Sequence, residues 1–223
     1  MPADVLVLFD LDGTLVAHDS EQSWVEFLIS EGRLNRLEVE ARGRDITELY
    51  NRGEAGTIEF SEFYLGLMSR FTIEQLRAWR DRWIEMRAVP RIRDDGRALI
   101  EKHRARHDLI VLTTAVFRFL AEAQAQELGI RNVIATDESV VDGHLTGRVS
   151  GIANAREGKV ERLREWLAAR GTRLDDFRQI FVYADSVNDL PLLSHATRPV
   201  AVNPDPVLAA HARHSGWETL FFP

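Results

Sequence analysis

The sequence predicts an α/β protein with a doubly wound, Rossmann-like parallel sheet and a small all-helical insert after the first strand. Short apolar runs, the first of them residues 5–9 (VLVLF), alternate with amphipathic stretches in the second half of the chain. Continuous apolar runs of this kind are typical of parallel strands that are buried on both faces. Between residues 18 and 90 the apolar residues instead recur at helical spacing. A chain of 223 residues is long enough for one α/β domain with such an insert.

The first predicted strand runs directly into an acidic loop. Asp10 and Asp12 follow the strand, and Gly13 suits a sharp exit from it. Ligands of open α/β sheets bind beyond the carboxyl ends of the strands, so chemistry is expected at this loop. Like charges about 4 Å apart repel by roughly 4 kcal/mol at an effective dielectric near 20, so paired carboxylates need a proton or a cation such as Mg²⁺. The alternative is that the two residues only form a turn or cap a helix.

The insert is predicted to hold about four helices. A capping box of Thr72 and Gln75 predicts the start of the last one, and Pro90 is expected to end it. The aromatic residues of the insert are expected to pack against each other rather than form a ligand cage. The other three helices are expected at residues 22–29, 34–50 and 57–68.

The second half of the chain alternates between strands and helices. Asp142 and Gly143 indicate a β-hairpin over residues 140–149. Strands are expected at residues 109–113, 133–135, 180–184 and 200–202, and helices at residues 95–106, 117–128, 160–169 and from 207 onward. This order of elements is typical of a parallel sheet with helices on both faces.

Composition narrows the function classes. The formal net charge of -7 argues against a nucleic-acid or anionic membrane partner. The absence of cysteine excludes disulfides, thiolate metal sites and a thiol nucleophile. No run is long enough to cross a bilayer, and the chain starts on a strand without a charged and apolar leader, so a cytoplasmic location is expected.

Four stretches, in this order along the chain, resemble the motifs of one enzyme family. They are residues 9–15 (FDLDGTL), 109–114 (LIVLTT), 158–160 (GKV) and 181–189 (FVYADSVND). Together they resemble the haloacid dehalogenase-like (HAD) hydrolases, and the helical insert resembles the C1 cap of subfamily IB, the phosphoserine phosphatase-like branch. The resemblance implies a HAD core domain of residues 1–17 and 91–223 and a helical cap domain of residues 18–90. The cap would close over the active site about hinges near Ala17 and Pro90.

The resemblance also implies roles for particular residues. Asp10 matches the nucleophile that forms an aspartyl-phosphate, and Asp12 matches the general acid/base. Thr114 matches the hydroxyl that binds a phosphoryl oxygen; its neighbour Thr113 would face the other way, because side chains alternate along a strand. Lys159 matches the lysine that neutralises the nucleophile and the phosphoryl group. The implied Mg²⁺ ligands are the carboxylates of Asp10 and Asp185 and the backbone carbonyl of Asp12.

Four further residues are candidates with alternatives. Asn188 and Asp189 would orient the metal-bound waters and Lys159, or cap the following helix. Asp19 stands nine positions after Asp10. In the phosphoserine phosphatases that the chain resembles, this position holds a Glu that contacts the substrate amine; the alternative is that Asp19 is a helix N-cap. Arg52 would contact substrate from the cap or lie on the surface. After Thr114 the chain reads Ala-Val-Phe, so it departs here from the Ser-Gly-Gly-Phe pattern of the phosphoserine phosphatases that it resembles.

These observations predict a Mg²⁺-dependent phosphatase that hydrolyses a small soluble phosphate monoester through an aspartyl-phosphate intermediate. If Asp19 faces the site, the substrate is expected to carry an amine. One alternative is a phosphotransferase or mutase on the same scaffold, and another is a non-catalytic phosphate-binding protein. Asp12 argues against the non-catalytic protein, because it supplies the proton transfers that turnover needs. Product analysis with and without an added acceptor separates the phosphatase from the phosphotransferase or mutase.

Overall fold

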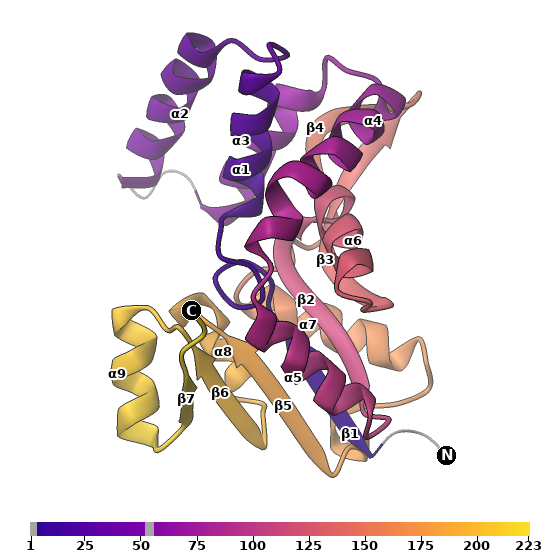
Figure 1. Ribbon diagram of the computed structural model, residues 1–223, viewed down its shortest axis with the longest axis vertical. Coiled ribbons are helices and arrows are strands. Elements are labelled where there is room, and N and C mark those ends of the chain that lie inside the picture. Colours follow the sequence, from indigo (N-terminus) through magenta and orange to yellow (C-terminus); the bar gives the residue numbers. More distant parts are fainter. Residues whose placement is uncertain (1–3, 52–55) are drawn as a thin grey trace.

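The computed structural model describes residues 4–51 and 56–223, and these form a seven-stranded sheet in the order β4-β3-β2-β1-β5-β6-β7 (Figure 1). All neighbouring strands run parallel except the antiparallel pair β3 and β4. The predicted α/β fold class is thereby confirmed. The strands are β1 (Val5–Phe9), β2 (Leu109–Phe117), β3 (Asn132–Val141), β4 (His144–Ser150), β5 (Gln179–Ala184), β6 (Arg198–Val202) and β7 (Glu218–Leu220).

Helices cover both faces of the sheet, as doubly wound topology requires. Side chains of β1 alternate between the two faces: Val7 and Phe9 join one hydrophobic cluster, and Leu6 and Leu8 join the other. All four are fully buried, and each buried Leu or Phe side chain stabilises the fold by roughly 1.5–3 kcal/mol. The first cluster includes residues of α5 (Asp94–Arg104) and α6 (Arg118–Glu127); the second includes residues of α7 (Glu157–Ala168), α8 (Leu190–Leu193) and α9 (Pro206–Ser215).

The helical insert lies above the carboxyl ends of the central strands (Figure 1). Trp24 packs against both Phe27 and Trp83, with ring centroids 5.8 Å apart in each pair, so the aromatic residues form an internal core as expected. The division of the chain into core and cap domains stays a prediction. The insert comprises α1 (Ser20–Ser30), α2 (Arg36–Asn51), α3 (Thr57–Met68) and α4 (Ile73–Trp83).

The end of the insert differs from the prediction. The capping box of Thr72 and Gln75 is present, but Pro90 does not end the α-helix. The α-helix stops at Trp83 and continues as a π-helical turn (Ile84–Ala88) and a 3₁₀ turn (Val89–Arg91). The Val89 N–H donates to the Ile84 carbonyl, the wide spacing of a π turn. Pro90 has no N–H to donate. It lies in the first two residues of the 3₁₀ turn, where no N–H donor is needed, so it is tolerated there.

The core and the insert meet at two chain crossings that lie side by side. The Ala17 N–H donates to the Arg91 carbonyl at 2.8 Å, and the Arg93 N–H donates to the Leu15 carbonyl at 2.9 Å. These bonds lie at the positions expected for the hinge.

The β3–β4 hairpin makes a further attachment to the insert. Asp142 and Gly143 form its turn with φ of 48° and 74°, so the predicted hairpin is confirmed. It is longer than expected, because β3 continues without a break from the sheet into the hairpin. Arg148 pairs with Glu62 of α3 at 2.7 Å. A Cβ at Gly147 would lie 3.2 Å from the Gly66 Cα, so the two backbones nearly touch.

The last strand was not predicted. Glu218–Leu220 is a three-residue run that pairs with β6 at the edge of the sheet, and its sequence carries no apolar pattern that distinguishes it from a tail. None of the helices in the described ranges is long and apolar enough to cross a lipid bilayer.

A buried histidine gives the core a predictable pH dependence. His103 lies between Asp108, 2.7 Å from its Nδ1, and the Tyr183 hydroxyl, 2.9 Å from its Nε2. Burial lowers the pKa of His103 below its usual 6.5, although Asp108 opposes the shift. The unfolded chain therefore binds more protons as the pH falls below about 6.5, and the contribution of neutral His103 to the unfolding free energy is lost there. We expect the difference in unfolding free energy between wild type and His103→Gln to shrink from pH 7.5 to pH 5 in urea titrations. A constant difference would contradict the assignment.

Candidate active site

The predicted catalytic carboxylates emerge from the carboxyl end of β1, between β2 and β5. The Asp10 N–H still belongs to the sheet and donates to the Tyr183 carbonyl at 2.9 Å. Gly13 follows with φ of 74°, and a Cβ there would collide with the Asp185 carboxylate. Only glycine therefore allows the loop after β1 and the loop after β5 to come this close.

Lys159 is buried among carboxylates. Its Nζ lies 2.8 Å from Asp10 Oδ1 and 2.6 Å from Asp189 Oδ1, and the residue is 2% exposed. Burial disfavours the ammonium, but the charges of Asp10 and Asp189 outweigh it and raise the pKa of Lys159. Lys159 comes in the first turn of α7, directly after Gly158, where a Cβ would collide with the Ala153 carbonyl. The structure thus joins the predicted lysine to the first and fourth motifs.

Negative charge is in excess at this point. Burial raises the pKa of Asp10 well above its usual range against the pull of Lys159, and Asp189 and Asp185 add to the rise. Burial and Asp189 raise the pKa of Asp185 to about 6. When Asp10, Asp185 and Asp189 are all ionised, they outnumber the single charge of Lys159 by two, and a divalent cation would balance this excess.

The donor set suits a hard cation with few protein ligands. Within residues 4–51 and 56–223, no group of three His, Cys, Asp or Glu side chains has the arrangement of a metal site built from side chains alone. The carboxylates of Asp10 and Asp185 are close enough for their charges to interact, and the resemblance adds the backbone carbonyl of Asp12 as a third donor. Mg²⁺ commonly takes one or two carboxylates and keeps several waters, so these residues fit it.

The Asp12 carboxylate is held by the first residue of α1. Ser20 donates its backbone N–H to Asp12 Oδ2 at 2.8 Å, and its hydroxyl donates to Asp12 Oδ1. Burial raises the pKa of Asp12 to about 7, and the Ser20 bonds only partly oppose the rise. A carboxyl group with this pKa can both give and take a proton near neutral pH, as a general acid/base must.

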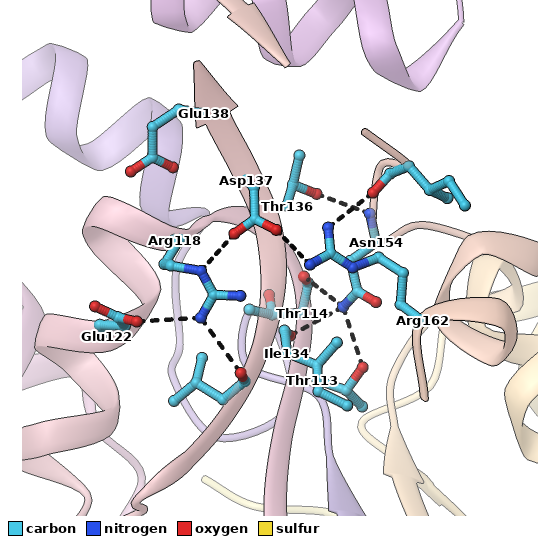
Figure 2. A network of polar contacts seen from close by, with 12 residues as sticks. Thr113, Thr114, Arg118, Glu122, Ile134, Thr136, Asp137, Glu138, Asn154 and Arg162 are labelled. Carbon is cyan, nitrogen blue, oxygen red and sulfur yellow. Dashed lines mark hydrogen bonds and ion pairs between the residues drawn. The ribbon is translucent and has the colours of Figure 1, made fainter. Parts of the chain in front are cut away.

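Thr114 lies in the second half of β2, where the buried Asn154 holds the backbone (Figure 2). The Asn154 Nδ2 donates to the carbonyls of Thr114 at 2.9 Å and Ile134 at 3.0 Å. It also lies 3.1 Å from Thr113 Oγ1, while the Thr114 hydroxyl accepts from the Val116 N–H at 3.2 Å. Thr113 is thus bonded to Asn154, and Thr114 remains the candidate phosphoryl ligand.

Figure 2 also shows the ion pairs that fix the loop carrying Asn154. Arg162 of α7 donates to the Ile152 carbonyl at 2.8 Å and to Asp137 Oδ2 at 2.5 Å. The other oxygen of Asp137 accepts from Arg118 of α6, and the two arginines lower the pKa of Asp137 although burial opposes them. This network ties α7, which carries Lys159, and the loop before it to the middle of β3.

The four further candidates of the sequence analysis differ from one another in burial and contacts. Asp189 is buried against Lys159 and makes no side-chain cap bond to α8, so the capping alternative is wrong for it. Asn188 is exposed. Asp19 is exposed and caps α1 by accepting from the Gln22 N–H at 2.8 Å, which confirms the N-cap alternative. Arg52 lies outside the described residues.

The sequence did not single out several side chains that surround these groups. Glu21 of α1 accepts from the Phe117 N–H at 3.3 Å, and burial, with the charges of Asp19 and Asp12, raises its pKa well above its usual range. The others are Ser20, Gln124 and Asn154. Their partners lie 8 to 106 positions away in sequence, so no local pattern indicates them.

Comparison with known proteins identifies the fold and the motifs. The model of the haloacid dehalogenase-like hydrolase family matches residues 7–194, which include all four motifs. The chain belongs to this family. The histidinol-phosphatase of Neisseria meningitidis serogroup C is 34% identical to it, over 97% of this chain and 98% of the relative. The phosphoserine phosphatase of Streptococcus thermophilus is 26% identical, over 93% and 87% of the two chains.

Solved structures share the fold of this HAD hydrolase. A protein of unknown function from Bordetella pertussis Tohama I has a TM-score of 0.93 and 39% identity over 98% of both chains. A substrate-bound phosphoserine phosphatase has a TM-score of 0.68 over 99% of this chain and 93% of that chain; at 20% identity it shows a shared fold alone. The predicted family and enzyme class, a HAD-type phosphomonoesterase, are confirmed.

Proposed function

We propose that this HAD hydrolase is a Mg²⁺-dependent phosphatase that cleaves the phosphate monoester of a small amino alcohol through an aspartyl-phosphate. One observation carries the proposal: Lys159 is buried between Asp10 and Asp189 at the carboxyl end of β1, with the Asp12 carboxyl two residues further on. This arrangement supplies a nucleophile, a fixed positive charge and a proton donor within one loop cluster.

Each residue has a defined part in the two steps. An Asp10 oxygen attacks phosphorus and the bond to the ester oxygen breaks, while Asp12 gives its proton to that leaving oxygen. Lys159 and the Thr114 hydroxyl stabilise charge on the phosphoryl oxygens. Asp12, now ionised, takes a proton from a water whose oxygen attacks phosphorus, and the P–O bond to Asp10 breaks. Phosphate leaves and both aspartates return to their starting state.

Bound Mg²⁺ would neutralise phosphoryl charge at the same place, held by Asp10, Asp185 and the Asp12 carbonyl. We expect chelator-treated protein to lose activity and to regain it with Mg²⁺. Mg²⁺ should also stabilise the folded protein, by about 2.7 kcal/mol at a hundredfold excess over its Kd. In Asp185→Asn, Mg²⁺ should not raise the melting temperature, whereas in the exposed-site control Asp175→Asn it should. Full turnover by the metal-free protein would refute the metal requirement.

Two observations support an amine-bearing substrate. The relative named histidinol-phosphatase aligns over nearly the whole chain, and histidinol phosphate carries an ammonium group two bonds from its ester carbon. Glu21 is a desolvated acid close enough to Asp12 and Asp19 for their charges to raise its pKa. An ammonium ion placed between α1 and the active site would compensate these charges. Asp19 can contribute to the same contact only through an oxygen that is not engaged in capping α1.

The substrate proposal is tested with a matched pair of esters. We expect kcat/KM to be on the order of 10²-fold higher for histidinol phosphate than for 3-(imidazol-4-yl)propyl phosphate, which lacks the amine, because an unpaired buried charge costs ~2–5 kcal/mol. Glu21→Gln should remove most of the preference, and Asp19→Ala should mainly lower the melting temperature through the lost cap. Equal rates on the two esters in wild type would overturn the amine contact but not the phosphatase.

The two alternatives make different products. A phosphotransferase or mutase would pass the phosphoryl group from Asp10 to a sugar or alcohol, whereas a non-catalytic binding protein would release nothing. Measuring free phosphate and phosphorylated acceptor together, with and without added alcohol, separates the three cases. The proposal requires one free phosphate for each ester consumed, whether or not an acceptor is present.

A further inference from the structure

A chain of buried polar side chains leads from α6 of the core to Asp12. Gln124 is fully buried, and its Nε2 donates to Ser20 Oγ at 2.9 Å. The Ser20 hydroxyl in turn donates to Asp12 Oδ1. At the other end, His18 Nε2 lies 3.3 Å from Gln124 Oε1. Apart from Asp12, none of these side chains has a part in the reaction described above.

The chemistry of the groups fixes the direction of every bond. An amide oxygen only accepts, so His18 must carry a hydrogen on Nε2. This bond orients the Gln124 amide with its NH₂ group toward Ser20. A hydroxyl has one hydrogen, and because Ser20 Oγ accepts from Gln124, that hydrogen is directed to Asp12. Gln124 therefore keeps Ser20 in the orientation in which it donates.

The arrangement also explains why Ser20 can hold both oxygens of Asp12. The backbone N–H of Ser20 at the start of α1 binds Asp12 Oδ2, and the oriented hydroxyl binds Asp12 Oδ1. Without Gln124, the hydroxyl could rotate to other acceptors, and the carboxyl would be held at one oxygen only. A displacement of about 1 Å at a reacting group can cost on the order of 10²-fold in rate.

We infer that Gln124 is a positioning residue that orients Asp12, through Ser20, for proton transfer to the leaving oxygen. The inference rests on the proposed role of Asp12 as the general acid. Gln124 touches no reacting atom, so its substitution should lower the rate most for substrates whose leaving oxygen most needs that proton. A basic leaving oxygen needs protonation in the transition state, whereas 4-nitrophenolate needs much less.

The experiment measures kcat/KM for aryl phosphates of increasing leaving-group basicity, from 4-nitrophenyl to 4-methoxyphenyl phosphate. We expect Gln124→Met to lose about tenfold more activity on the 4-methoxyphenyl ester than on the 4-nitrophenyl ester, in the same direction as Asp12→Asn. Gln124→Glu keeps the side-chain shape but can accept from the Ser20 hydroxyl, so it should show the same trend. Gln126→Met, on the exposed face of the same helix, is the matched control and should run parallel to wild type.

Combined variants and thermal unfolding separate positioning from packing. Adding Gln124→Met to Ser20→Ala should not change the dependence of kcat/KM on the leaving group further, because Ser20→Ala already removes the hydroxyl through which Gln124 acts on Asp12. An equal loss on all esters in both Gln124 variants, accompanied only by a lower melting temperature, would overturn the inference. If Asp12→Asn itself lost activity equally on all esters, the proposed role of Asp12 as the general acid would fail first and the inference with it.

Discussion

Asp10→Asn is expected to abolish turnover while the protein stays folded. The amide cannot displace the ester oxygen to form the covalent phosphate, and loss of a nucleophile in comparable enzymes lowers kcat on the order of 10⁶-fold. Lys159 keeps Asp189 as a partner in the variant, so its charge is not left unpaired. Phosphate release gives the rate, and mass spectrometry of acid-quenched enzyme detects the phosphorylated Asp10 peptide in wild type only.

The control is an aspartate of the same chain far from the chemistry. Asp175 is exposed in a 3₁₀ turn before β5, at the opposite end of the sheet. Asp175→Asn should keep wild-type rates and the covalent phosphate. Wild-type turnover by Asp10→Asn, or a phosphorylated peptide that maps elsewhere, would require another nucleophile.

Lys159→Met should have the second largest effect, on activity and stability together. Removing a single charge-stabilising donor typically lowers kcat 10²–10³-fold, which sets about the smallest loss expected here. In metal-free protein the variant also leaves Asp10 and Asp189 buried with no cation, and breaking a buried pair in this way costs about 3–5 kcal/mol.

The stability loss should depend on pH in a defined direction. Burial raises the pKa of Asp10 and the Lys159 charge opposes this rise, so without Lys159 the folded-state pKa of Asp10 lies still further above 3.8. The folded variant then binds more protons than the unfolded chain, and its unfolding free energy falls as the pH rises through this interval. Urea titrations at pH 5 and pH 8 measure the effect. Lys102→Met, at an exposed position of α5, is the control, and a loss independent of pH would contradict the pairing.

Local pattern was sufficient for most of the fold. The run before Asp10 had to be a buried strand because it is apolar on both faces, and the β-hairpin was predictable because Asp142 and Gly143 accept positive φ. Strand ends were less predictable, since β2 continues to Phe117, which was predicted to begin the next helix, and β3 continues to Val141 through mostly polar residues. The edge strand β7 depends on β6 as its pairing partner, which no local pattern records.

The same distinction applies to the site: residues that belong to a motif were predictable, and residues whose contacts depend on the fold alone were not. The order of the motifs predicted that Lys159 would meet Asp10, across 149 positions of sequence, and the ion pair is present. By contrast, Asn154 and Gln124 are single polar residues, and the sequence around each of them matches no motif. Their importance arises only where the fold brings buried carbonyls or a hydroxyl to them, so the sequence could not indicate it.

The contact of the β3–β4 hairpin with α3 limits how the helical insert could move on the sheet. Two attachment points define an axis about which a rigid body swings freely, and the crossings at Ala17 and Arg91 would provide such an axis. The hairpin adds a third point away from it, through Glu62 and Arg148 and the close approach of Gly66 and Gly147. A body fixed at three points that are not in line cannot swing. A swing of the insert about this axis would therefore require this contact to separate, or the hairpin to bend where the pairing of β3 and β4 is irregular, between Glu138 and Val140.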